Sequence, residues 1–164
     1  MGLKETLETF KADNAKGIRK FNVRIEDNGA MSFKVSMGEK PHVVFTGSPP
    51  GLGGEDKGPS PLLLTLGVIG ACIGTVIKFW AQIMDIKIDN IDISMRGNIN
   101  LCGIFGIGDH KAAFTDLKPI VRITTSEDKA KIDELLKNVE EHCPAFFLIR
   151  DANPIEWDVK LKSS

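Results

Sequence analysis

Residues 62–84 read LLLTLGVIGACIGTVIKFWAQIM. Apolar residues occupy nearly every side of this segment when it is drawn as a helix, which is typical of a helix buried all round rather than along one stripe. The uncharged run ends at Lys78 and is shorter than the ~18 residues that a membrane span requires. The segment therefore predicts a long, buried central helix, which we place at residues 60–85.

Small residues recur inside this predicted helix, at Gly67, Gly70, Ala71 and Gly74. They lower helix propensity, but they leave a stripe over which another backbone can approach closely. A chain of 164 residues can hardly surround so apolar a helix by itself. We therefore predict a homodimer in which a second copy covers the helix.

The segment in front of the helix, residues 47–61, reads GSPPGLGGEDKGPSP and is too rich in glycine and proline for regular structure. It predicts a connecting loop. Ser60 is placed to cap the helix, and Pro61 occupies the first helical position, which proline favours.

Earlier in the chain, apolar residues alternate with polar ones in three runs, FNVRIE, MSFKVS and HVVFT. An Asp-Asn-Gly turn at residues 27–29 and Gly38 separate the runs. This pattern predicts an antiparallel strand meander over residues 20–46. Before it, leucines and a phenylalanine at helical spacing predict a short amphipathic helix over residues 1–16.

The region after the central helix, residues 86–164, returns to strand periodicity in IKIDNIDISMRGNI, KPIVRITT and, at the end, IEWDVKLK. We expect a second antiparallel sheet, interrupted by an amphipathic helix over residues 127–142. Pro144 ends that helix, and AFFLIR predicts a further short helical turn. The predicted fold is α+β, with two antiparallel sheets around the central helix in a single domain, residues 1–164.

Composition and charge limit the classes of partner. The 21 basic and 22 acidic residues leave a formal charge of −1, so no field gathers nucleic acid or anionic lipid. Small molecules and proteins are the expected partners, and neither nucleic acid nor membrane is. The first residues lack a continuous apolar leader, which favours a cytoplasmic protein. In that reducing compartment, three cysteines predict transient, catalytic pairing rather than structural disulfides.

Cys72 and Cys143 are the residues whose placement points to chemistry. Cys72 lies within the apolar helix, where burial raises the pKa of a thiol and a free cysteine can equally serve as a small hydrophobe. Cys143 precedes Pro144, so it can cap a new helical turn whose free amides favour a thiolate. The adjacent His142 either complements the end of the preceding helix or acts as a base. Cys102 lies in a glycine-rich segment between strands and is assigned a structural role.

Metal binding is not expected. The cysteines could be combined with His42, His110 or His142, but the short spacings typical of zinc ligands do not occur. No cofactor is implied by any other motif.

The sequence around the two cysteines forms recognisable motifs. GEDKGPSPLLLTLGVIGAC, residues 54–72, leads from Gly-Pro-Ser-Pro into a helix that reaches Gly-Ala-Cys, and EHCPAFFL, residues 141–148, places Cys-Pro at the end of a later helix. Between them lies RGNINLCGIFGI, residues 96–107. The two cysteine motifs resemble those of the OsmC/Ohr family, and the intervening segment resembles a less-characterised OsmC-like branch. The resemblance spans residues 20–160.

The resemblance implies an intertwined homodimer whose paired central helices build two active sites at their interface. It also implies a thiol-dependent peroxidase that acts on a hydrophobic hydroperoxide. In this scheme Cys72 attacks the hydroperoxide as a thiolate and becomes a sulfenic acid, and Cys143 condenses with it. An external dithiol then reduces the resulting disulfide.

The chain departs from the hydroperoxide-resistance branch in its charged residues. That branch has an arginine in the first strand turn and a glutamate nine or ten residues before the first cysteine, where this chain has an Asp-Asn-Gly turn, Leu62 and Leu63. The candidate thiolate stabilisers are instead the nearby Arg19 and Arg24, together with His142.

The absence of that charged pair favours an alternative, a non-catalytic module of the same fold that binds an apolar small molecule. Its pocket is predicted to be lined by Leu62, Leu63, Phe79 and Phe146, with Phe147 and Trp80 as further candidates.

Overall fold

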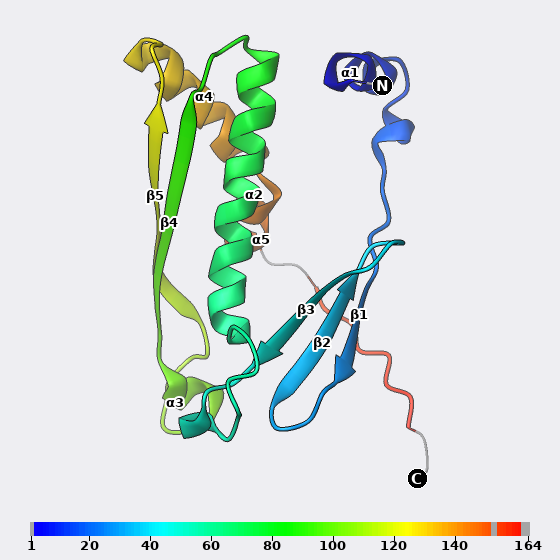
Figure 1. The fold of residues 1–164 in the computed structure, drawn as a ribbon, viewed down its shortest axis with the longest axis vertical. Helices are drawn as coiled ribbons and strands as arrows, with labels where there is room; N and C mark the ends of the chain where they lie inside the picture. Colours follow the sequence, from blue (N-terminus) through cyan, green and yellow to red (C-terminus); the bar gives the residue numbers. More distant parts are fainter. Residues whose placement is uncertain (1, 152–153, 162–164) are drawn as a thin grey trace. The chain divides into compact units, whose positions relative to one another are not determined.

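The computed structural model describes residues 2–151 and 154–161. The chain forms two compact units, whose boundary in the sequence falls between Val68 and Ile69. The first unit contains α1 (Leu3–Ala12), β1 (Val23–Asp27), β2 (Ser32–Met37), β3 (His42–Gly47) and the beginning of α2 (Pro61–Ile83). The second contains the rest of α2, β4 (Asn90–Ile99), α3 (Leu101–Ile104), β5 (Phe114–Thr124), α4 (Lys129–His142) and α5 (Pro144–Arg150) (Figure 1). The predicted α+β class, with two antiparallel sheets and a long central helix, is confirmed, and the single-domain organisation stays a prediction.

The first unit contains the expected meander. β1, β2 and β3 form an antiparallel sheet in that order, with Val35 of β2 lying between Ile25 and Val44. In the turn between β1 and β2, the Ser32 amide donates to the Gly29 carbonyl at 2.8 Å, and Gly29 has a φ of +72°. Glycine suits this position because it adopts left-handed backbone angles without a Cβ clash.

The N-terminal helix is shorter than the predicted range 1–16. α1 ends at Ala12 because Asp13 is extended, with a φ of −154°, and its side chain accepts a hydrogen bond from the Ala15 amide. Residues 14–17 then form a separate 3-10 turn. Met1 lies outside the described residues.

Gly54 and Gly58, in the loop in front of α2, lie where main-chain segments approach each other closely. A Cβ at Gly58 would lie only 2.2 Å from the carbonyl oxygen of Phe45. Ser60 caps α2 as predicted, since its hydroxyl accepts a hydrogen bond from the Leu63 amide at 3.3 Å.

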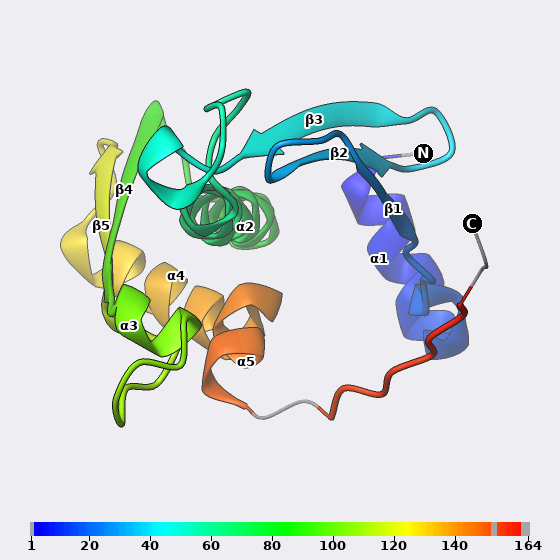
Figure 2. The ribbon, with the colours of Figure 1, turned by 90° about the horizontal axis from the view of Figure 1, so that it is seen from below.

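The core of the second unit forms where α2 packs against the β4–β5 sheet and against α4 and α5 (Figure 2). Two glycines bring the helix close to the sheet. A Cβ at Gly70 would lie 2.9 Å from Met95 Cγ, and one at Gly74 would lie 3.2 Å from Ile93 Cδ1. Part of the predicted small-residue stripe therefore accommodates side chains of this chain's own sheet. The buried apolar core residues are Ile69, Ile73, Val76, Ile77, Ala81, Ile86, Leu135, Val139, Cys143 and Ala145.

α2 is the core helix of this unit, but within one chain it is buried along one face. Ile77 is fully buried, whereas Phe79 and Ile83 leave 47% and 43% of their surface exposed. Within one chain the sheet and the later helices cover only one face of α2. Burial all round depends on the predicted second copy and stays a prediction. By length and composition α2 could cross a membrane, a property that it shares with the core helices of soluble proteins.

The C-terminal region differs from the prediction in its last element. α4 begins at Lys129 rather than at residue 127, and α5 lies where a short helical turn was expected. The predicted strand over residues 155–162 is wrong for its described part, residues 155–161, which have no regular structure, and Lys162 lies outside the described residues. A strand forms only when its amides and carbonyls pair with a neighbour. No described segment provides that neighbour, so the second sheet consists of β4 and β5 among the described residues.

Candidate active site

Cys72 and Cys143 lie next to each other in the second unit. Their Sγ atoms are 3.9 Å apart, although the residues are separated by 71 positions in the sequence. Both are free thiols. A disulfide requires a separation of about 2.05 Å, so the sulfurs are already neighbours and need only a small further approach to bond.

The main chain on both sides holds Cys143 in place. Its amide donates to the Val139 carbonyl at 2.9 Å, which closes the last turn of α4. Its carbonyl accepts from the Phe146 amide at 3.0 Å, so the same residue begins α5. Pro144 favours the extended backbone that Cys143 adopts, with φ −83° and ψ 118°. The Cys143 side chain is fully buried as a result.

Cys72, in the middle of α2, is partly exposed, and its surroundings pull its pKa in opposite directions. Burial raises the pKa of the Cys72 thiol, and so does the neighbouring Cys143 thiol, whereas a hydrogen bond from the Ala145 amide lowers it. Ala145 is the second residue of α5, so its amide is one of the donors that a helix leaves free at its start. The amide expected to favour a Cys143 thiolate therefore lies at the sulfur of Cys72. None of the described groups that shift this pKa is a cation.

His142 is held beside α2 rather than at the sulfurs. Its ring lies against Trp80, with 4.7 Å between the ring centroids. Nδ1 lies 2.9 Å from the Asn138 carbonyl oxygen, which can only accept, so Nδ1 carries a hydrogen and Nε2 is the free nitrogen of the neutral ring. No hydrogen bond joins His142 to either sulfur in the described part of the chain.

Arg19 and Arg24 belong to the first unit, where each has partners of its own. The Arg19 guanidinium donates to the Ile18 carbonyl at 2.9 Å and lies 5.7 Å above the ring of Phe10. Arg24 pairs with Glu26 at 3.1 Å. Their role as thiolate stabilisers stays a prediction.

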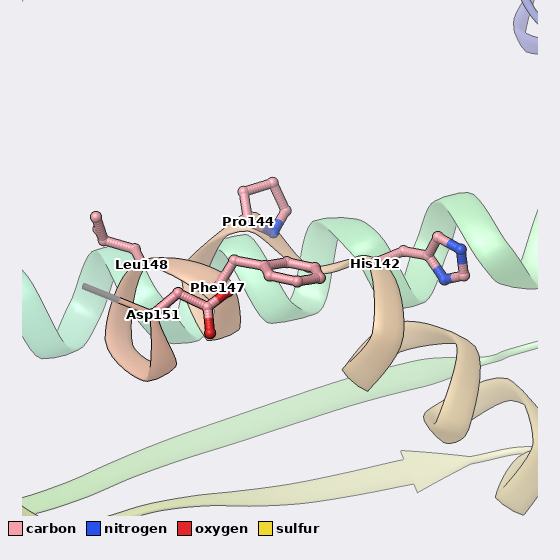
Figure 3. Close-up of a pocket in the computed structure, with 5 residues that line it drawn as sticks. All are labelled: His142, Pro144, Phe147, Leu148 and Asp151. Carbon is pink, nitrogen blue, oxygen red and sulfur yellow. The ribbon is translucent and has the colours of Figure 1, made fainter. Parts of the chain in front are cut away.

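A pocket of about 510 Å³ opens beside the α4–α5 junction (Figure 3). It is lined by His142, Pro144, Phe147, Leu148 and Asp151. Pro144, Phe147, Leu148 and Asp151 are spaced so that they share one face of α5 and its end. Neither cysteine is among the lining residues.

Of the residues predicted to line an apolar pocket, Phe147 lines this one, and the others do not. Phe146 packs against the core, and Phe79 is half exposed on α2. Leu62 and Leu63 belong to the first unit. Their pocket role stays a prediction. Leu148 and Asp151 were missed, although continuing the helical spacing from Pro144 would have indicated them.

The family model described as OsmC-like protein matches residues 54–158, which include both cysteines. The chain belongs to the OsmC-like family. No curated protein matches its sequence.

Solved structures share the fold of this OsmC-like protein. An OsmC like protein from Mycoplasma pneumoniae is 17% identical, with a TM-score of 0.68 over 81% of this chain and 89% of that one. An organic hydroperoxide resistance protein OsmC from Legionella pneumophila is 16% identical, with a TM-score of 0.59 over 82% and 91% of the two chains. An organic hydroperoxide resistance protein from Elizabethkingia anophelis is 15% identical, with a TM-score of 0.59 over 82% and 90%. At these identities the likeness shows the fold alone.

Cys102 of this OsmC-like protein lies in α3, apart from the cysteine pair in the fold. Its amide donates to the side chain of Asn100 at 3.0 Å, which caps the short helix. A Cβ at Gly103 would lie 2.5 Å from the main chain of Lys111, so glycine is needed for this close approach. Among residues 2–151 and 154–161, no group of three or more His, Cys, Asp or Glu side chains could hold a metal ion.

Proposed function

We propose that this OsmC-like protein is a thiol-dependent peroxidase that reduces organic hydroperoxides through a dithiol–disulfide cycle of Cys72 and Cys143. The observation that carries the proposal is the 3.9 Å separation of the two sulfurs. Membership of the OsmC-like family supports it, and two solved structures of the same fold are named as organic hydroperoxide resistance proteins.

In the proposed cycle, the partly exposed Cys72 is the nucleophile. Its thiolate attacks the hydroperoxide, an S–O bond forms as the O–O bond breaks, and an alcohol leaves. The Cys143 thiol then attacks the Cys72 sulfenic acid, which forms the disulfide and releases water. An external dithiol supplies two electrons and two protons to restore both thiols and is itself oxidised to a disulfide. The Ala145 amide, donating to the Cys72 sulfur, favours the thiolate that starts the cycle.

Counting thiols after a single exposure to cumene hydroperoxide tests the proposal. The wild-type protein should lose one pair of thiols, and Cys72→Ser should lose none. Cys143→Ser should lose a single thiol, as a sulfenic acid that dimedone labels at Cys72. Cys102→Ser is the matched control and should behave as the wild type does. A wild-type protein whose thiols survive an excess of hydroperoxide would contradict the proposal.

The raised pKa of Cys72, without a cation among the described groups that shift it, favours a second candidate function. In this alternative the fold is a non-catalytic module that binds an apolar small molecule, and Phe147 and Leu148 of the α5 pocket supply apolar surface for it. Native mass spectrometry of the purified protein should then detect a bound apolar compound while the thiols stay inert. Reactive thiols with no bound compound would exclude it.

We also propose that the protein acts as a homodimer in the cytoplasm. The exposed apolar side chains of α2, Phe79 and Ile83, support a second copy as the cover of this face. Three free cysteines suit a reducing compartment, where external dithiols are available. Light scattering should report twice the chain mass of 17.9 kDa, and cell fractionation should recover the protein with cytoplasmic markers.

A further inference from the structure

We infer that the external dithiol attacks the sulfur of Cys72, so that the transient mixed disulfide forms on Cys72 and Cys143 is the first thiol to be released. This inference rests on the proposed dithiol–disulfide cycle. It assigns two successive reactions to one sulfur, since Cys72 would meet both the hydroperoxide and the reductant.

The two sulfurs differ in how easily a reductant can reach them. Cys143 is fully buried, and the main chain holds it from both sides, through the Val139 carbonyl and the Phe146 amide. A reductant could reach its sulfur only if the α4–α5 junction opened. Within one chain Cys72 is partly exposed on the continuous helix α2, so no main-chain movement of that chain is needed there. Thiol–disulfide exchange depends on which sulfur an attacking thiolate can reach.

The pocket at the α4–α5 junction is an open space through which a reductant could approach the Cys143 sulfur instead. It is bounded by His142 and Pro144, the residues on either side of Cys143, and its volume of about 510 Å³ would admit a small thiol. Cys143 itself is nevertheless absent from the lining and has no exposed surface. The pocket therefore ends at the proline ring and the α5 side chains instead of at the sulfur.

The two routes also differ in which cysteine thiolate is expelled when the reductant attacks the disulfide. Burial is the largest of the effects on the pKa of the Cys72 thiol, and it raises that pKa. A thiol with a raised pKa is a poor leaving group in exchange reactions. Attack on Cys143 would have to expel Cys72 in the bimolecular step, whereas attack on Cys72 leaves its departure to the later step, in which the second thiol of the reductant attacks within the mixed disulfide.

The first thiolate of the reductant forms a bond to the Cys72 sulfur while the Cys72–Cys143 bond breaks, and the electron pair leaves with Cys143, which takes up a proton. The second thiolate of the reductant then attacks its own partner sulfur, closes the reductant's disulfide and releases Cys72 as a thiolate. Because the disulfide form of the protein links the two half-reactions, the kinetics should be ping-pong whichever sulfur the reductant attacks.

Single-cysteine variants test the inference without hydroperoxide. Cys102→Ser/Cys143→Ser retains Cys72, and Cys102→Ser/Cys72→Ser retains Cys143. Each is converted to its glutathione mixed disulfide in denaturant and refolded, and its reduction by dithiothreitol is timed. The Cys72 adduct should be reduced roughly tenfold faster or more, since rates follow access. In denaturant the two rates should converge. Equal rates in the folded state, or faster reduction at Cys143, would overturn the inference.

A trapping experiment covers the case in which the Cys143 adduct fails to refold. The Cys102→Ser protein is oxidised with diamide, mixed briefly with limiting glutathione, quenched in acid, alkylated and digested with trypsin. Cys72 and Cys143 fall on separate tryptic peptides, residues 58–78 and 138–150. Glutathione should appear on the first peptide, and its appearance mainly on the second would overturn the inference. Because diamide replaces the hydroperoxide, loss of peroxidase activity would count against the proposed function alone. Failure of diamide to form the disulfide would overturn the inference and the cycle together.

Discussion

At the scale of single residues, Cys72 is placed where a thiol is accessible but not strongly activated. Burial and Cys143 raise its pKa, and the Ala145 amide only partly offsets this effect. At neutral pH the thiolate fraction is therefore small, and it grows as the pH rises toward the raised pKa. We expect the rate of reaction with hydroperoxide to increase with pH across the neutral range.

The contribution of Cys143 to this pKa can be measured. We predict that Cys143→Ala shifts the pH profile for alkylation of Cys72 by iodoacetamide to lower pH, because the variant removes a charge and a hydrogen bond that raise the pKa. Mass spectrometry of the tryptic peptide 58–78 reports Cys72 alone. Cys102→Ala, which leaves the pair intact, is the control. An unchanged or higher midpoint in Cys143→Ala would contradict the assigned electrostatics.

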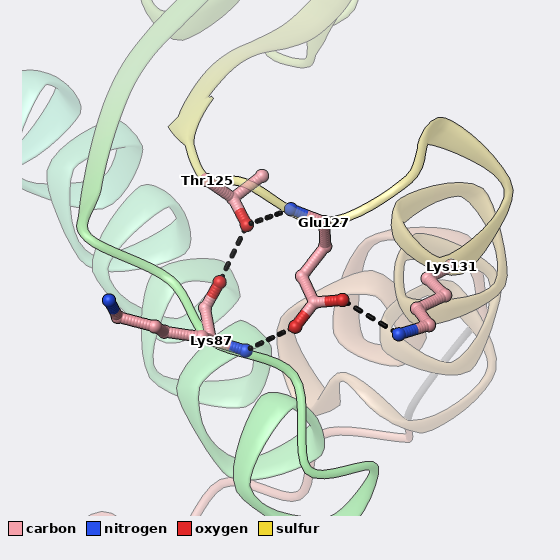
Figure 4. A network of polar contacts seen from close by, with 4 residues as sticks. All are labelled: Lys87, Thr125, Glu127 and Lys131. Carbon is pink, nitrogen blue, oxygen red and sulfur yellow. Dashed lines mark hydrogen bonds and ion pairs between the residues drawn. The ribbon is translucent and has the colours of Figure 1, made fainter.

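At the scale of secondary-structure elements, a polar network ties the α2–β4 connection to the start of α4 (Figure 4). Glu127 accepts from the Lys87 amide at 3.2 Å and pairs with Lys131 at 2.7 Å. Thr125 Oγ1 donates to the Lys87 carbonyl at 2.6 Å and accepts from the Glu127 amide at 3.1 Å. The network thus helps to position α4, the helix that ends at Cys143.

This network should make stability depend on acid pH. Lys131, and then the Lys87 amide, hold the pKa of Glu127 below its ordinary value. A lowered pKa in the folded state stabilises the protein at neutral pH, and this stabilisation is lost as the pH falls through the lowered value. We predict that Glu127→Gln is less stable than the wild type at neutral pH and that the difference shrinks in acid. Urea unfolding at several pH values measures it, with Glu140→Gln, on the exposed face of α4, as the control. A difference that persists below the lowered pKa would contradict the network.

The loop in front of α2 gives a second prediction at this scale. Gly58→Ala would place a Cβ 2.2 Å from the Phe45 carbonyl oxygen, which is main chain and cannot rotate away. We expect a loss of about 2 kcal/mol or more in the free energy of unfolding, as in other overpacked sites. Gly51→Ala, in the same loop with no atom within 4 Å, should change it by less than about 0.5 kcal/mol. Urea titration of both variants decides the matter, and equal stabilities would refute the close approach.

At the scale of the whole molecule, the surface of one chain retains apolar side chains that a second copy would cover. Phe79, on the exposed face of α2, is the sharpest probe of the proposed homodimer. We predict that Phe79→Asp yields monomers by light scattering, because a carboxylate would be buried without a partner at the interface. Phe105→Asp, at an exposed position after α3, is the control and should leave the mass unchanged. A Phe79→Asp protein with the wild-type mass would argue against this face as the interface.

Local patterns predicted the elements well where local interactions define them. Ser60 caps α2, Pro144 separates two helices, and the Asp-Asn-Gly turn joins β1 to β2. The N-terminal helix was predicted too long because Gly17 was taken as the signal for its end, whereas a hydrogen bond to the Asp13 side chain stops the helix earlier. The strand predicted over residues 155–162 failed because alternation describes its side chains, whereas a strand also needs a partner.

By itself, the sequence determined the α+β class, the central helix and the cysteine motifs, since periodicity and short motifs are properties of neighbouring residues. Only the tertiary structure decided that Gly70 and Gly74 receive side chains of β4, that the Ala145 amide lies at Cys72, and that Cys143 is the buried sulfur of the pair. These are contacts between residues far apart in the chain. They depend on how the helices and strands pack against one another. The hydrophobic periodicity of a single helix or strand indicates only which of its sides is apolar.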